Sequence, residues 1–95
     1  MRKYELALIF DPSLDEKGID EELSKITSLI EKQDSKVEDI DKWGMKKLAY
    51  PINKQENGYY IFMYFQGDDE LLEELNRVSN INDRLLRHLI IKREK

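Results

Sequence analysis

The sequence predicts an α+β domain in which two helices cover one face of a four-stranded antiparallel sheet. Three observations support this class. The segments follow the order strand, helix, strand, strand, helix, strand. Two of them carry apolar residues at the spacing of an amphipathic helix. Two of the strands, Arg2–Phe10 and Tyr59–Phe65, are apolar on both faces, as central strands are. We expect residues 1–95 to form a single domain.

The composition narrows the class of protein. Hydrophobic residues make up 40% and charged residues 38% of the chain, which predicts a modest core and a strongly hydrated surface. Cysteine is absent, so disulfides and cysteine-based metal sites are excluded. The sequence has no apolar run near the ~18–20 residues of a membrane span, and Met1-Arg2-Lys3 is followed by mixed sequence. We therefore expect a cytoplasmic protein without a membrane partner.

The first strand and helix follow from alternation and capping. In Arg2–Phe10 the even positions are expected to face the core: Tyr4, Leu6, Leu8 and Phe10. Asp11-Pro12 ends this strand. Ser13 and Glu16 have the spacing of a capping box, and Asp15 is an alternative N-cap. The helix that follows has one apolar stripe, formed by Ile19, Leu23, Ile26, Leu29 and Ile30.

The second and third strands are predicted to form a hairpin. Lys36–Ile52 is expected at a sheet edge, because Pro51 lacks an N–H and the many charges discourage pairing with other chains. Gly44 is expected to mark a bulge. The segment Lys54–Gly58, which ends in Asn-Gly, is predicted to turn the chain into Tyr59–Phe65. That strand would leave three aromatic rings on the sheet face away from the helices: Tyr60, Phe62 and Tyr64.

The last third of the chain completes the fold. Asp68 is expected to cap a second helix, Asn80–Asp83 forms a loop, and Leu85–Ile91 is the final strand. With right-handed crossovers, this order gives the ferredoxin-like split β-α-β sandwich, βαββαβ, with strand order 4-1-3-2. The second and fourth strands then lie at the two edges.

The charges are unevenly distributed. The net charge is −4, but residues 11–41 carry −7 and residues 67–75 carry −5, whereas residues 42–66 carry +3 and residues 76–95 carry +4. Since the acidic segments are mainly helical, one interpretation is an acidic helical back and a basic front. The alternative is that these are ordinary solvated faces. Charge alone does not decide between them.

Nothing in the sequence predicts catalysis. His88 is the only histidine and has no patterned nucleophile or acid beside it, which favours a structural or partly exposed histidine. The acids that begin the second helix lack the spacing of a calcium loop, and the scattered glycines form no phosphate-binding loop. We therefore expect no enzyme activity, cofactor, metal site or small-molecule substrate. The segment Asn57–Ile61 matches only the glycine and first aromatic of an RNA-recognition motif, so base stacking of that kind is not predicted.

A family resemblance adds a function. The string WGMKKLAYPI at Trp43–Ile52, followed by Asn57-Gly58-Tyr59-Tyr60, resembles the bacterial small-subunit ribosomal protein six family. The opening Arg2-Lys3-Tyr4-Glu5, and Arg87 with Lys92 near the end, match that family too, so the resemblance covers essentially the whole chain. It implies a non-catalytic protein that binds the central domain of small-subunit rRNA as a heterodimer with ribosomal protein eighteen.

The resemblance also implies site residues. The rRNA contacts would be Arg2, Tyr4, Lys54, Arg87 and Lys92, and we expect the four bases to share one flank. The protein partner would contact Trp43, Met45, Lys46, Lys47, Tyr60, Phe62 and Tyr64. Trp43 departs from the aliphatic residue more common in the family. The competing prediction is a small self-associating or regulatory ferredoxin-like domain, but the sequence lacks the loop glycines of a ligand cleft.

Overall fold

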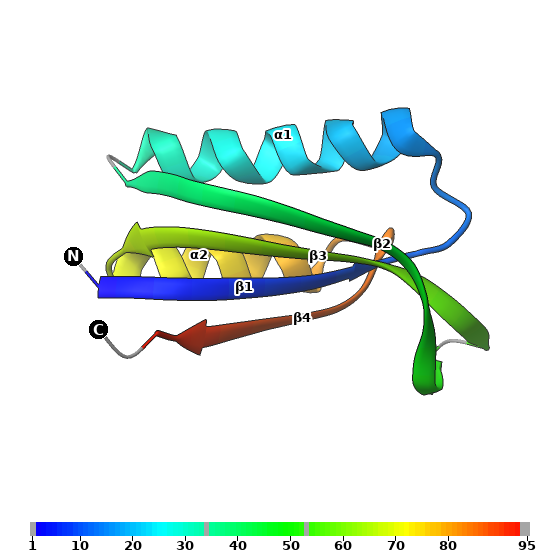
Figure 1. The fold of residues 1–95 in the computed structure, drawn as a ribbon. Coiled ribbons are helices and arrows are strands. Elements are labelled where there is room, and N and C mark those ends of the chain that lie inside the picture. The colour runs from blue at the N-terminus through cyan, green and yellow to red at the C-terminus, as the bar shows by residue number, and fades with distance from the viewer. Residues whose placement is uncertain (1, 34, 53, 94–95) are drawn as a thin grey trace.

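A computed structural model describes residues 2–33, 35–52 and 54–93. These residues form β1 (Arg2–Phe10), α1 (Glu16–Lys32), β2 (Lys36–Ile52), β3 (Gln55–Gly67), α2 (Asp69–Asn80) and β4 (Leu85–Lys92). The strands pair antiparallel in the order β2-β3-β1-β4, which is 4-1-3-2 read from the other edge (Figure 1). The predicted ferredoxin-like α+β fold and its strand order are confirmed.

The core lies between the sheet and the two helices. Both helices bury their apolar stripes against the same face of the sheet, where alternate residues of β1 and β3 point. The most buried side chains there include Leu6, Leu8, Phe10, Ile19, Ile30, Ile61, Met63, Phe65, Leu71 and Leu75. Neither of the two described helices covers the opposite face of the sheet, here called the open face (Figure 1).

The helix starts are fixed by aspartates. Asp15 is the N-cap of α1, and its Oδ1 accepts a hydrogen bond from the N–H of Gly18 at 2.8 Å. The predicted capping box at Ser13 is wrong, because the N–H of Ser13 instead donates to Oδ1 of Asp11 in the preceding turn. Asp68 caps α2 as predicted, since its Oδ1 accepts from the N–H of Leu71 at 3.0 Å.

The edge strand β2 pairs only with β3 and is largely exposed on both faces. Its register with β3 shifts between Lys42 and Gly44, and Gly44 has φ +88°. The predicted bulge at Gly44 is therefore confirmed. The end of the β2–β3 hairpin bends away from the helices and toward the β4 side of the sheet (Figure 1).

The predicted turn over Lys54–Gly58 is correct at Lys54 but wrong for the residues after it. Ile52 pairs directly with Gln55, and Lys54 in this turn has φ 68°. Asn57 and Gly58 lie inside β3, which therefore begins earlier than Tyr59–Phe65.

Gly58 is needed for a different reason. A Cβ on Gly58 would lie 2.4 Å from Cγ2 of Ile9 and 3.4 Å from Cδ2 of Leu48. Its φ is not positive, so the backbone conformation does not demand glycine. The absence of a side chain lets Leu48, which is 6% exposed, pack down where β2 bends over the open face.

Candidate interaction surface

The centre of the open face is aromatic. Tyr60, Phe62 and Tyr64 of β3 point away from the helices, as predicted, and are half-buried. The indole of Trp43 on β2 packs on the ring of Phe62, with centroids 4.7 Å apart and planes at 58°. Since Trp43 is 54% exposed, it extends the aromatic surface to the edge of the sheet.

An apolar recess lies between β3 and β4. It has a volume of about 270 Å³, and the side chains that line it include Ala7, Ile9, Tyr60, Phe62, Arg87 and Leu89. Nη1 of Arg87 donates a hydrogen bond to the hydroxyl of Tyr50 at 2.8 Å. This bond joins the bent end of β2 to β4 across the open face.

The other end of the open face is polar. Glu38 of β2 accepts hydrogen bonds from Nε2 of Gln66 at 2.6 Å and Nη1 of Arg93 at 3.1 Å, and Lys3 lies 4.0 Å away. The hydrogen bond from Gln66, helped by the charges of Lys3 and Arg93, lowers the pKa of Glu38 below its ordinary value. The guanidinium of Arg93 also lies 5.0 Å from the ring centroid of Tyr64. One polar row thus connects β1, β2 and β3 with Arg93, the residue that follows β4.

The predicted rRNA-contacting bases are distributed over β1, β4 and the β2–β3 turn. Lys92 stands opposite Tyr4 in the β1–β4 register, at the end of the sheet where Arg2 begins β1. Arg87 stands opposite Ile9, five residues beyond Tyr4 along β1, or about 17 Å at ~3.3 Å per residue. Lys54 is in the β2–β3 turn, within the hairpin end that bends toward the β4 side of the sheet (Figure 1). The register puts Lys92 on the helix-facing side with Tyr4 and Arg87 on the open face with Ile9. The four bases therefore do not share one face and do not gather in one patch.

The ring of Tyr4 requires a correction. It is 4% exposed and stacks on Phe65 with centroids 5.7 Å apart. Because the ring faces the helices, it is a core residue, and we withdraw it from the predicted rRNA contacts.

The predicted partner-binding residues also separate. Trp43 and the three β3 aromatics lie together on the open face. Met45 is 48% exposed, but it stands opposite Tyr59, whose hydroxyl donates to Glu16 of α1. Met45 therefore belongs to the helix-facing side of β2. Lys46 and Lys47 are exposed on the same strand.

The predicted basic front is wrong. Asp39 and Asp41 stand opposite Tyr64 and Phe62 in the β2–β3 register, so they belong to the open face together with Glu38. The open face is mixed in charge, as ordinary solvated faces are. The sequence pattern failed here because three of the acids before residue 42, Glu38, Asp39 and Asp41, lie on β2 and not on a helix.

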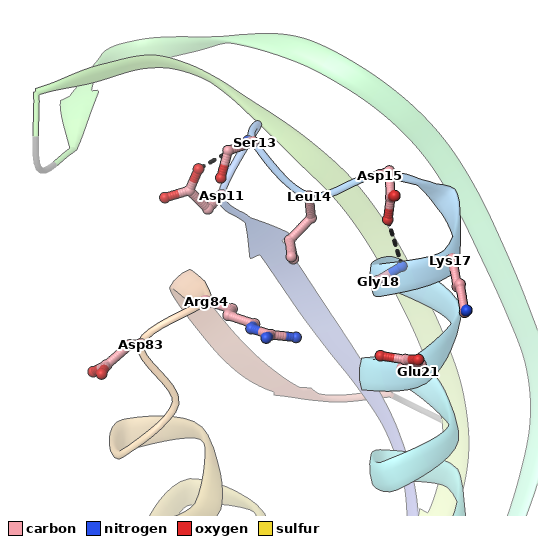
Figure 2. Close-up of a pocket in the computed structure, with 9 residues that line it drawn as sticks. All are labelled: Asp11, Ser13, Leu14, Asp15, Lys17, Gly18, Glu21, Asp83 and Arg84. Atoms are coloured by element: carbon pink, nitrogen blue, oxygen red, sulfur yellow. Dashed lines mark hydrogen bonds between the residues drawn. The ribbon is translucent and has the colours of Figure 1, made fainter.

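A polar cavity of about 610 Å³ lies where α1 begins and α2 ends, between the β1–α1 and α2–β4 loops (Figure 2). Figure 2 shows Arg84 extending from the α2–β4 loop toward α1. Its Nη1 donates to Oε2 of Glu22 at 3.2 Å, and Nδ2 of Asn82 donates to Oε1 of the same carboxylate at 2.9 Å. Glu22 is only 3% exposed, so these bonds stabilise the junction between α1 and the α2–β4 loop.

No part of the described chain brings together three or more His, Cys, Asp or Glu side chains able to hold a metal ion. His88 faces α2, where its Nε2 lies 2.9 Å from Oδ1 of Asn76. Burial lowers the pKa of His88. This is the structural role that the sequence favoured. Among the described helices, none is long and apolar enough to cross a membrane.

Comparison with known proteins decides the family. The family model described as "Ribosomal protein S6" matches residues 3–92. The chain belongs to the ribosomal protein S6 family. It is 47% identical to the small ribosomal subunit protein bS6 of Clostridium acetobutylicum over 95 residues, the full length of both chains. It is 46% identical to bS6 of Clostridium botulinum strain 657 over 94 residues, which cover 99% of this chain and 100% of that one.

The fold agrees with a solved S6 structure. The crystal structure of 30S ribosomal protein S6 from Thermotoga maritima superposes with a TM-score of 0.90 at 28% identity, covering 97% of this chain and 87% of that one. The predicted S6 resemblance is confirmed. This S6 family member is a protein of the small ribosomal subunit, which is cytoplasmic, and its family is structural and not enzymatic.

Proposed function

We propose that this protein binds the central domain of small-subunit rRNA together with ribosomal protein S18. The observation that supports the protein partner is the composition of the open face. Trp43 is exposed beside the β3 aromatics, and the apolar side chains of Leu89 and Ile91 on β4 are 47% and 43% exposed. Apolar side chains gathered on one sheet face are typical of a protein-binding surface.

The rRNA contacts would come from the β4 side. Residues 84–93 contain four basic residues and no acidic one. Arg84 and Arg93 pair with Glu22 and Glu38, so the bases proposed to contact phosphates here are Arg87 and Lys92. Arg2 lies in β1, two residues before Tyr4, which stands opposite Lys92 at the end of β4. Lysine and arginine contacts to phosphates give an affinity that falls steeply with salt and carries little sequence specificity.

Net charge makes the partner necessary in this proposal. A chain of net charge −4 is repelled by the phosphate backbone, apart from its few local bases. A basic S18 would supply most of the positive charge, so the heterodimer forms before RNA binding or with it.

The test is a titration of a central-domain rRNA fragment at about 0.15 M salt, with this protein alone and with S18. We expect weak binding alone and tight binding by the pair. Nanomolar binding by the isolated protein would refute the proposal. Sizing of the purified protein checks the alternative of a self-associating domain.

A residue-level test uses two arginines on opposite sides of the molecule. Arg87→Ala removes an exposed base on the open face, whereas Arg77→Ala removes one on α2, where it pairs with Glu74. We expect Arg87→Ala to weaken rRNA binding by the pair and to reduce its salt dependence by about one charge. Arg77→Ala should change neither. A lower melting temperature with unchanged RNA binding in Arg87→Ala would remove Arg87 from the contacts.

A further inference from the structure

The indole of Trp43 is held in one orientation beside a carboxylate. Its Nε1–H donates to Oδ2 of Asp41 at 3.0 Å, and the ring leans on Phe62. More than half of the side chain stays exposed. An exposed tryptophan with a fixed ring and an adjacent carboxylate offers a π face and a negative charge to the same incoming group.

Charge indicates what kind of group fits. Asp41 and Asp39 are both exposed and lie on the open face, and neither forms an ion pair within the part of the chain that the structure describes. Their carboxylates would repel a nucleotide, because its base is attached to a phosphate. A cation is favoured instead, and a guanidinium is the cation that both stacks on an aromatic face and pairs with a carboxylate.

The fold contains an arrangement of this kind two residues away in the register. Arg93 lies over Tyr64 and donates to Glu38, so one guanidinium meets a ring of β3 and a carboxylate of β2. Trp43 and Asp41 repeat the combination of ring and carboxylate at the outer edge of the sheet, where the arginine would have to come from another molecule.

We propose that Trp43 and Asp41 form a binding site for an arginine side chain of the protein partner, with Asp39 adding negative charge. This inference rests on the proposed partnership with S18 and names the chemistry of one contact in it. The site orients the partner, since a guanidinium stacked on Trp43 must approach over the β2 edge of the open face.

The test uses variants that keep the local hydrogen bonds. Asp41→Asn removes the charge but keeps an oxygen that can accept from Nε1 of Trp43, and Trp43→Leu removes the ring. The control is Glu73→Gln, which removes one charge from an exposed position on α2. Thermal unfolding checks that all three variants fold.

Binding of S18 is measured by calorimetry, and the environment of Trp43 by fluorine NMR. Trp43 is the only tryptophan, so 5-fluorotryptophan labels this site alone. We expect S18 to shift the resonance. Asp41→Asn and Trp43→Leu should each weaken S18 binding by about fivefold or more, and Glu73→Gln by less than about twofold. Unchanged affinity in Asp41→Asn, or an unshifted resonance at saturation, would overturn the inference.

Two further outcomes are decisive. If the rRNA fragment alone shifts the resonance and Asp41→Asn tightens RNA binding, the ring stacks on a base and the arginine site is wrong. If S18 does not bind the wild-type protein, the proposed partnership fails. Tetra-arginine and tetra-lysine peptides then test the site by itself. A shift with arginine only, lost in Asp41→Asn, supports the site, and equal or absent shifts refute it.

Discussion

Replacing Gly58 with alanine tests the packing that bends β2 over the open face. The added Cβ would lie 2.4 Å from Cγ2 of Ile9, whereas carbon atoms in contact are ~3.5–4.0 Å apart. The two atoms must therefore separate by at least about 1 Å. Ile9 is β-branched and has little rotamer freedom, so part of the adjustment has to come from the β1 or β3 backbone.

The expected cost follows from this overlap. Overpacking of this kind costs about 2 kcal/mol. Alanine also restricts the unfolded chain, and this stabilises the protein by about 0.5 kcal/mol where the folded backbone can accept alanine. Gly58 is such a position, because its φ is not positive. The net loss of about 1.5 kcal/mol should lower the melting temperature by roughly 6–12 °C in a domain of this size.

The assay is urea unfolding of four proteins: wild type, Gly58→Ala, Ile9→Ala and the double variant. If the contact with Ile9 causes the loss, Gly58→Ala should cost little further stability once Ile9 is alanine, and the cycle should show a coupling of about 1 kcal/mol or more. A turn glycine would behave differently, since a backbone penalty does not depend on Ile9. An unaltered free energy of unfolding in Gly58→Ala, or equal losses in both backgrounds, would refute the packing argument.

Three other perturbations have defined outcomes. In urea unfolding, Glu22→Gln should lower the free energy of unfolding by about 1 kcal/mol, because it weakens the charge-assisted hydrogen bond from Arg84. The control is Glu21→Gln at an exposed position, whose free energy of unfolding should stay within ~0.5 kcal/mol of wild type. Leu75→Ala removes a side chain that is 1% exposed and should cost about 2–5 kcal/mol by thermal unfolding. Burial lowers the pKa of His88 in the folded protein below its ordinary value of 6.5. Near pH 6.5 the unfolded chain therefore binds more protons than the folded protein, and the free energy of unfolding should rise as the pH rises through this range. His88→Gln should flatten this rise between about pH 5 and 7.5, and an equal slope in both proteins would contradict it.

The fold was predictable because its determinants are local and repeated. Alternation in β1 and the helical stripes assign each element to a layer, and these patterns are confirmed by the buried residues. The hairpin was not predictable in the same way. Asn57-Gly58 is a strong turn signal, but the contact of Gly58 with Ile9 joins residues 49 positions apart and leaves no mark in the local sequence.

The surface was harder to predict than the core. The three aromatics of β3 were placed correctly, because alternation fixes which face they share. The pairing of Trp43 with Asp41 was missed, although the two-residue spacing within one strand puts both on one face and could have indicated it. The charge of the open face was misjudged because segment totals ignore which element carries each acid.

Tyr4 shows how two kinds of inference conflict within one residue. The alternation of β1 puts Tyr4 on the core face with Leu6, Leu8 and Phe10, whereas the family resemblance made it an rRNA contact. The structure agrees with the alternation, because the ring is buried against Phe65. Moving it to the open face would require a one-residue shift of register, which would expose the whole apolar set of β1. A resemblance can therefore indicate that a position matters, but the strand's period of two decides which side chains a partner can touch.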